Sequence, residues 1–347
     1  MFRMTKRIEY IDTVKGFAII LMVFGHMKFH NFNWFIYAFH MPLFFILSGY
    51  FFNPDKSVCN RVRKLLVPYL VTSVILIIIE IIDSLVKNCL FHLDYHYNYN
   101  QVVDRIFASF WGAVKPVGIG EFLFPEVGPI WFLLALMIGI FLLQLLFKIE
   151  NLLLIRNFTC FGCFGLAVLG WLISLGRGQM PFSINQSLLV PLFLMIGMKL
   201  KYDRRFSITK FIVAIIMGSL LLVIQKNVRF MSLRQMECVL FPVYIVGSIS
   251  ISYVVIVCFK FVCEHCKLTI LSKVGSITLW ILCIHSIDIM GIQPKVIALL
   301  SESGLLIEYK SLVYFLYQVV VYLIPISFIL RKKSYCGKIK TKQILSV

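Results

Sequence analysis

The feature that most constrains this chain is a succession of apolar stretches, most of them close to the length that crosses a bilayer. A membrane-spanning helix needs roughly 20 mostly apolar residues. We identify ten such stretches, of which the sixth is the shortest, at residues 12–27, 35–52, 65–86, 130–147, 158–175, 187–200, 208–224, 239–259, 274–291 and 312–330. They are continuous rather than alternating, which argues against a membrane β-barrel. We therefore expect an all-α polytopic membrane protein with about ten transmembrane helices, folded as a single domain over residues 1–347.

Composition supports a bilayer environment. Of the 347 residues, 60% are hydrophobic and only 14% are charged, whereas soluble domains carry about 25% charged residues. The formal net charge is +18, but Lys and Arg lie in short clusters between apolar stretches rather than along one basic face. This pattern indicates membrane topology and contact with lipid, and it excludes a nucleic-acid partner.

The distribution of Lys and Arg predicts the orientation of the chain. If the N-terminus is cytoplasmic, 23 of the 34 Lys and Arg residues lie in inside segments and 10 in outside segments, with Lys15 inside the first span. Cytoplasmic segments carry such an excess. We therefore expect a multi-pass protein of the cell (inner, cytoplasmic) membrane with both termini cytoplasmic, a basic cytoplasmic tail at residues 331–347, and an extracytoplasmic loop at residues 87–129 between the third and fourth spans.

That loop carries aromatic and acidic side chains, among them Trp111, Glu121 and Glu126. Such side chains suit stacking and hydrogen bonding to sugars, but they equally suit an interfacial aromatic belt. Loops of this length often have a function, so both interpretations stay open.

The first apolar stretch contains Asp12, Lys15 and His26. At 100° per residue, Lys15 and His26 lie on one face of a helix, about 16 Å apart along its axis, and Asp12 can pair with Lys15 at i, i+3. Ionisable residues within a span usually face a cavity or a partner. The alternative is that Lys15 extends to the inner interface and His26 lies at the outer one.

Other polar residues interrupt the later spans. His40 opens the second span at the depth of His26, and Ser48 lies near its end. His285 lies within the ninth span and either has a function or makes a helix-to-helix hydrogen bond, with Asp288 one turn later able to orient its ring. Glu80 falls near the outer end of the third span, where it makes either polar packing or an acceptor contact.

A basic cluster of Arg61, Arg63 and Lys64 precedes the third span. It either contacts lipid phosphates or forms an anion site for a phosphorylated cofactor. Two Cys-x-x-Cys pairs, at residues 160–163 and 263–266, have zinc-ligand spacing. The first lies in an apolar helix, where cysteine behaves as a small hydrophobe, so we expect no metal.

Taken in order, five segments resemble the acyltransferase-3 family of membrane O-acyltransferases, and within it the fucose 4-O-acetylase-like or polysaccharide O-acetyltransferase branch. The segments are YIDTVKGF through GH at 10–26, FHMPLFFILSGY at 39–50, RVRKLLVPY at 61–69, GPIWFL at 128–133 and VGSITLWILCIH at 274–285. The resemblance implies that His26 is catalytic and that Lys15 is needed beside it. It also makes Trp131, in the fourth-span motif, a possible substrate contact. The family's Arg-x-x-Arg element reads Arg61 to Lys64 here, which leaves open which cation acts.

The resemblance further implies an enzyme that transfers an acetyl group from cytoplasmic acetyl-CoA to a hydroxyl of a cell-surface or lipid-linked carbohydrate, such as capsule, O-antigen or exopolysaccharide. His26 would either remove the hydroxyl proton or carry the acetyl group itself. The alternatives are transfer of succinyl or another acyl group, or a transporter of polysaccharide or lipid-linked sugar. Transporters usually show two related halves, and no internal repeat is evident. A scaffold subunit would leave His26 and Lys15 without a role.

Overall fold

The computed structural model describes the chain from Ile8 to Val296 with short gaps, and three residues beyond it. The described residues are 8–26, 32–91, 95–112, 114–119, 122–124, 126–176, 180–203, 206–234, 236, 240–296, 317 and 321–322. Nearly all of them are helical, which agrees with the expected all-α class.

The helices follow the apolar stretches of the sequence. They are α1 (Glu9–His26), α2 (Asn33–Tyr50), α3 (Val58–Phe91), α4 (Tyr95–Trp111), α5 (Trp131–Leu153), α6 (Phe158–Gly176), α7 (Ile184–Ser187), α8 (Val190–Tyr202), α9 (Ile208–Asn227), α10 (Phe241–His265), α11 (Thr269–Gly275) and α12 (Thr278–Ile287). A 3-10 turn at Pro181–Ser183 precedes α7, and a π-helical turn at Asp288–Ile292 follows α12. Two short strands, β1 (Val117–Ile119) and β2 (Phe122–Phe124), pair antiparallel.

Several helices have the length and composition of membrane spans. In the described part of the chain there are five, and seven if each of two bent helix pairs is one span. Large apolar side chains on their outer faces are exposed, for example Phe161 and Phe164 on α6 and Ile216 on α9. Water would disfavour such faces, whereas lipid accepts them, so the molecule is a multi-pass membrane protein. Helix α1, which carries Glu9, Asp12 and Lys15, and helix α2 are not in this group.

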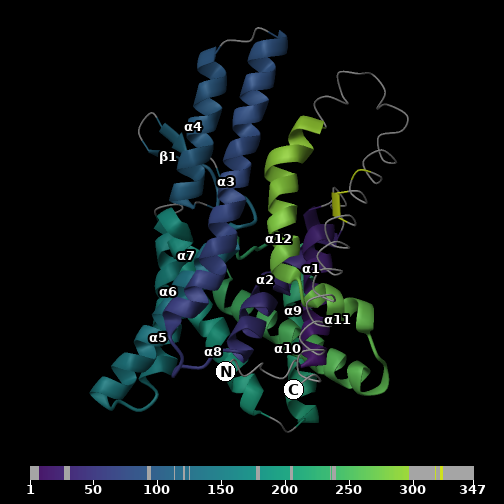
Figure 1. The fold of residues 1–347 in the computed structure, drawn as a ribbon. Coiled ribbons are helices and arrows are strands. Elements are labelled where there is room, and N and C mark those ends of the chain that lie inside the picture. Colours follow the sequence, from purple (N-terminus) through teal and green to yellow (C-terminus); the bar gives the residue numbers. More distant parts are fainter. Residues whose placement is uncertain are drawn as a thin grey trace, which may run out of the picture.

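The helices surround α1 and α2 (Figure 1). Helix α2 contacts α1, α8, α9 and α10, while α1 also packs against α11 and α12. Helices α1 and α11 approach closely, since a Cβ added to Gly16 would lie 2.1 Å from the carbonyl oxygen of Leu271. Only glycine permits this distance, so Gly16 fixes the crossing that holds the N-terminal half of α1.

The structure differs from the expected layout in three places. Residues 87–129 are not one irregular loop: α3 continues to Phe91, α4 runs back along α3, and the β1–β2 hairpin follows (Figure 1). The sixth and ninth spans are bent, by 49° between the Pro181–Ser187 and Val190–Tyr202 helices and by 65° between Thr269–Gly275 and Thr278–Val296. Most of the expected tenth span, and the tail at 331–347, lie outside the described residues.

Candidate active site

A cavity of about 230 Å³ lies beside α1. Its walls come from α1, α2, α5 and α12, from the segment that precedes α5, and from the segment that follows α9. Its polar lining residues are Lys15, His26, Tyr37, His40, Ser48, Glu126, Trp131, Arg234 and Thr278. The remaining wall is apolar, as is usual where a few polar groups orient a ligand.

Lys15 and His26 both line this cavity, as their spacing in α1 predicts. Lys15 Nζ lies 3.8 Å from Asp12 Oδ1 and 4.5 Å from the ring centre of Phe51. The half-buried His26 ring lies 6.2 Å from that of Tyr37. Because the two residues are 11 positions apart in one helix, the cavity extends along about 16 Å of α1.

An ion pair lies at the His26 end of the cavity. Arg234 Nη2 donates to Glu126 Oε2, and each side chain is about one-third exposed. Buried groups hold the Arg234 segment in place: Gln186 Nε2 donates to the Arg234 carbonyl at 2.8 Å, and the Tyr244 hydroxyl accepts from Leu233 N at 3.2 Å. The guanidinium and carboxylate are therefore set in the wall before any ligand arrives.

The segment before α5 also requires a specific backbone. Gly128 has φ of +77°, and a Cβ there would lie 2.3 Å from Met290 Cγ. Glycine allows both the positive φ and the close approach. The turn delivers Trp131, only 3% exposed, to the cavity wall at the start of α5.

His40 and Ser48 line the cavity from α2. His40 Nδ1 donates to the Ile36 carbonyl at 2.8 Å, which leaves Nε2 as the acceptor of that ring. The Ser48 hydroxyl donates to the Phe44 carbonyl at 2.8 Å. His40 thus presents an acceptor near His26, and Ser48 lies about two helical turns closer to the Lys15 end.

The basic cluster at the start of α3 is divided between two faces. Arg61 is half-buried: its guanidinium lies 4.7 Å from the Phe52 ring centre, and Nη2 donates to the Asn53 carbonyl at 2.6 Å. Among the described residues, its buried Nη1 has no hydrogen-bond partner. Leu65, one turn later on the same face, lines the cavity, whereas Arg63 and Lys64 are exposed. Only Arg61 is therefore directed toward the protein interior beside the cavity.

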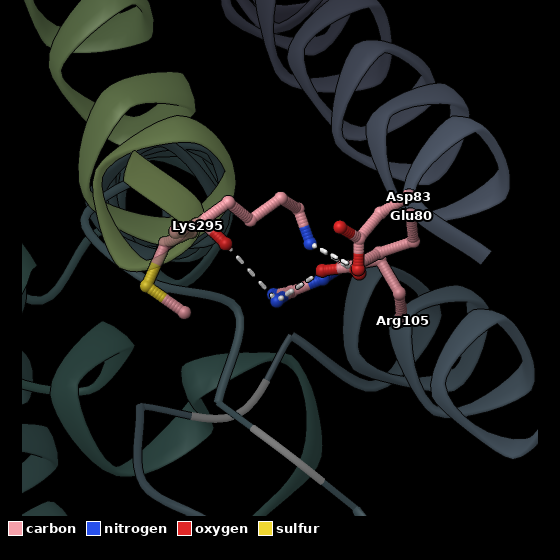
Figure 2. Close-up of polar contacts among 5 residues, drawn as sticks. Glu80, Asp83, Arg105 and Lys295 are labelled. Atoms are coloured by element: carbon pink, nitrogen blue, oxygen red, sulfur yellow. Dashed lines mark hydrogen bonds and ion pairs between the residues drawn. The ribbon is translucent and has the colours of Figure 1, made fainter. Parts of the chain in front are cut away.

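Glu80 belongs to an ion-pair network away from the cavity lining (Figure 2). Its Oε1 lies 3.3 Å from Arg105 Nη2 and its Oε2 lies 2.9 Å from Lys295 Nζ, which also lies 3.1 Å from Asp83 Oδ2. Arg105 Nη2 further donates to the Met290 carbonyl at 3.3 Å. The network joins α3, α4 and the helical segment after α12.

His285 lies on α12 directly behind His26. The two ring centres are 5.0 Å apart, and His285 is 2% exposed. Its Nδ1 is hydrogen-bonded to the hydroxyl of Tyr322, which donates to Asp288 Oδ2 at 3.1 Å. Asp288 therefore reaches the imidazole through Tyr322 rather than directly.

Three residues that contribute to this region escaped the sequence reasoning: Arg234, Tyr37 and Tyr322. The orientation expected from the sequence puts Arg234 among the ten Lys and Arg residues of the outside segments, where such cations are expected to be scarce, and this scarcity is a signal. Tyr37 precedes His40 by about one helical turn and shares its face. For Tyr322 the sequence offers no signal, since its contact to His285 spans 37 residues.

Seven cysteines of the described part of the chain are free, namely Cys59, Cys160, Cys163, Cys258, Cys263, Cys266 and Cys283. Within the described residues no group of three His, Cys, Asp or Glu side chains is placed to hold a metal. The chemistry available at the cavity is that of imidazoles, one ammonium, one guanidinium and one carboxylate. Such groups can move a proton and stabilise developing charge.

Apolar helices of spanning length surround a cavity that is lined by two histidines, an arrangement that fits a membrane-embedded enzyme. The comparison with protein families agrees: the profile of the acyltransferase domain of the acyltransferase-3 family matches residues 8–332. The chain therefore belongs to this family and is a membrane acyltransferase. Neither the curated proteins nor the solved structures gave a match.

Proposed function

We propose that this protein transfers an acetyl group from cytoplasmic acetyl-CoA to a hydroxyl of a carbohydrate at the outer face of the cell membrane, as in the fucose 4-O-acetylase-like branch. The observation that carries the proposal is the single cavity shared by Lys15 and His26. A donor made inside the cell and an acceptor at its surface require such a passage along a spanning helix.

The proposed topology has ten spans with both termini in the cytoplasm. The excess of Lys and Arg in the segments that then lie inside supports it. In this orientation the Lys15 end of α1 and Arg61 are near the cytoplasm. His26, Glu126 and Arg234 are near the outer face.

Arg61 is the proposed contact for the phosphates of the donor. A guanidinium can bind phosphate through two parallel hydrogen bonds, and Arg61 has a buried Nη1 without a partner among the described residues. The flexible arm of the donor would then extend past Leu65 and Lys15 toward His26, along walls that are mostly apolar. The exposed Arg63 and Lys64 would add a weaker, screened attraction.

His26 is the proposed base. In direct transfer, its imidazole accepts the proton of the sugar hydroxyl as the sugar oxygen attacks the thioester carbonyl. The C–O bond forms, the C–S bond breaks, and the imidazolium returns the proton to the thiolate. If His26 carries the acetyl group instead, a C–N bond to the imidazole forms as the C–S bond breaks. The sugar oxygen then forms the C–O bond as the C–N bond breaks, and the hydroxyl proton ends on the thiolate.

Glu126 and Arg234 are proposed to bind the acceptor. Carboxylate and guanidinium groups form charge-assisted hydrogen bonds to hydroxyls, and both side chains are partly exposed at the His26 end of the cavity. His40, with Nε2 as an acceptor, could bind a second hydroxyl of the same sugar. Trp131 closes the wall beneath them.

The test is mass analysis of surface glycans from cells with and without this protein. One additional acetyl group per repeating unit, present only when the protein is present, is the expected result. A mass increase that corresponds to a succinyl group would mean that the donor is succinyl-CoA rather than acetyl-CoA. The protein would still be a membrane acyltransferase. Unmodified glycan together with accumulation of sugar inside the cells that lack the protein would instead indicate a transporter.

A further inference from the structure

Asp288, Tyr322 and His285 form a chain of hydrogen-bonded groups next to His26. Direct acetyl transfer with His26 as the only base gives these groups no role. The chain begins at Asp288, which is fully buried. Its Oδ1 accepts from the Tyr317 hydroxyl, and its Oδ2 accepts from the Tyr322 hydroxyl at 3.1 Å. Two donors therefore satisfy a carboxylate in an apolar environment where an uncompensated charge would be costly.

The direction of these bonds determines the tautomer of His285. The Tyr322 hydroxyl donates its single hydrogen to Asp288 Oδ2. The Tyr322 oxygen can then only accept from His285, whose Nδ1 must carry the hydrogen. Consequently His285 Nε2 holds a lone pair.

That lone pair is buried and unused within the described residues. His285 Nε2 has no hydrogen-bond partner there, although leaving a buried acceptor unsatisfied costs free energy. A histidine that served only to bind Tyr322 would not require a buried Nε2 without a hydrogen-bond partner. The ring that lies 5.0 Å away, centre to centre, is His26.

We propose that His285 is a positioning residue for His26: when substrates are bound, its Nε2, which has no partner among the described residues in this structure, accepts an N–H from the His26 ring. This inference rests on the proposed function. The bond fixes the tautomer of His26, so that its other nitrogen is the base. When that nitrogen takes the hydroxyl proton, the charge of Asp288, transmitted through Tyr322 and His285, stabilises the imidazolium. The proton stays on His26 until it passes to the thiolate, and His285 keeps its own proton throughout.

The arrangement performs the task of the carboxylate that orients histidine in a Ser-His-Asp triad. Here the carboxylate is separated from the catalytic imidazole by two neutral groups. This keeps a full negative charge out of contact with the cavity, where it would compete with Asp12 and Glu126 for ion pairing with Lys15 and Arg234. It also places Asp288 on the same helical segment as His285, the ring that Asp288 orients through Tyr322.

The kinetic test uses the purified full-length protein in proteoliposomes, with acetyl-CoA and alkali-de-O-acetylated surface polysaccharide of the host cell as substrates. Tyr322→Phe removes one hydroxyl and keeps the ring. We expect kcat to fall about 10- to 100-fold, as for other groups that act through an oriented imidazole, with KM for acetyl-CoA unchanged. Tyr253→Phe on α10, which removes a hydroxyl that does not line the cavity, is the matched control and should retain the wild-type kcat.

A double-mutant cycle tests whether the groups act as a chain. His285→Ala should lower kcat at least as much as Tyr322→Phe, and the double variant should be no worse than His285→Ala alone, because groups acting through one another are not additive. Additive losses, or a wild-type kcat in Tyr322→Phe, would overturn the proposal. Wild-type activity in these variants together with an inactive His26→Ala would leave the proposed function standing.

A measurement that does not depend on acyl transfer tests the role of His285 separately from the proposed function. The ¹⁵N chemical shifts of the histidine rings in detergent micelles report which nitrogen carries hydrogen. We expect His285 to be protonated at Nδ1 in the wild type, and the His26 shifts to change in Tyr322→Phe but not in Tyr253→Phe. Protonation of His285 at Nε2 would overturn the chain whether or not acyl transfer is observed.

Discussion

Lys295 Nζ lies 2.9 Å from Oε2 of Glu80, although the two residues are 215 positions apart in the chain (Figure 2). This contact joins the segment after α12 to α3, and Arg105 adds α4 to the same network. The network also fixes the π-helical turn, because Arg105 donates to the Met290 carbonyl within it. Met290 lines the cavity, so the network supports the site without facing it.

Lys295→Met should therefore destabilise the protein. Removing one partner of a buried ion pair costs about 3–5 kcal/mol. We expect less than this, because Lys295 is 28% exposed and Arg105 still pairs with Glu80. The measurement is the midpoint of thermal unfolding in detergent, with the exposed Lys260→Met on α10 as control. Equal midpoints for the two variants would show that the network contributes no stability.

His26→Ala should abolish acyl transfer. Loss of a general base lowers the rate by at least about 100-fold, and loss of a nucleophile would lower it further. The matched control is His265→Ala, since His265 is exposed at the end of α10. Acetyl incorporation into glycan is measured at equal amounts of protein in the membrane. Wild-type incorporation by the His26 variant would remove the proposed mechanism.

Arg61→Ala should weaken donor binding more than Arg63→Ala does. Arg61 is half-buried with an Nη1 that lacks a partner among the described residues, whereas Arg63 is exposed. A charge-assisted hydrogen bond contributes about 1.5–3 kcal/mol, so KM for acetyl-CoA should rise about tenfold or more in Arg61→Ala. Titration of acetyl-CoA at saturating acceptor measures it. Similar effects of the two variants would mean that general charge, not a specific phosphate contact, binds the donor.

Glu126→Gln should impair acceptor use and leave donor use intact. The substitution keeps the shape of the side chain but removes the charge that holds Arg234. We expect KM for the polysaccharide to rise several-fold, by about 1 kcal/mol or more for a weakened charge-assisted bond, with KM for acetyl-CoA unchanged. The donor titration on the same preparation is the internal control. A rise in both constants would point to a distorted cavity rather than to an acceptor contact.

The sequence alone determined most of the long apolar helices and which face of α1 is polar, but not α4. Both follow from local periodicity: an apolar stretch must satisfy its own backbone hydrogen bonds in a bilayer, and two residues 11 positions apart in a helix must share a face. Lys15 and His26 could therefore be assigned to one face of α1 before any fold was known, whereas the cavity that this face lines is given by the structure. The same reasoning could not locate the bends in the sixth and ninth spans, because bends arise where neighbouring helices supply the missing hydrogen bonds.

The tertiary structure alone decided which groups meet. It brought His285 within 5.0 Å of His26 across 259 positions of sequence, placed Arg234 beside Glu126, and assigned Glu80 to an ion-pair network. It also divided the basic cluster, turning Arg61 inward and Arg63 outward. These contacts depend on how helices cross, and crossings depend on close packing at positions such as Gly16 rather than on the pattern within any one helix.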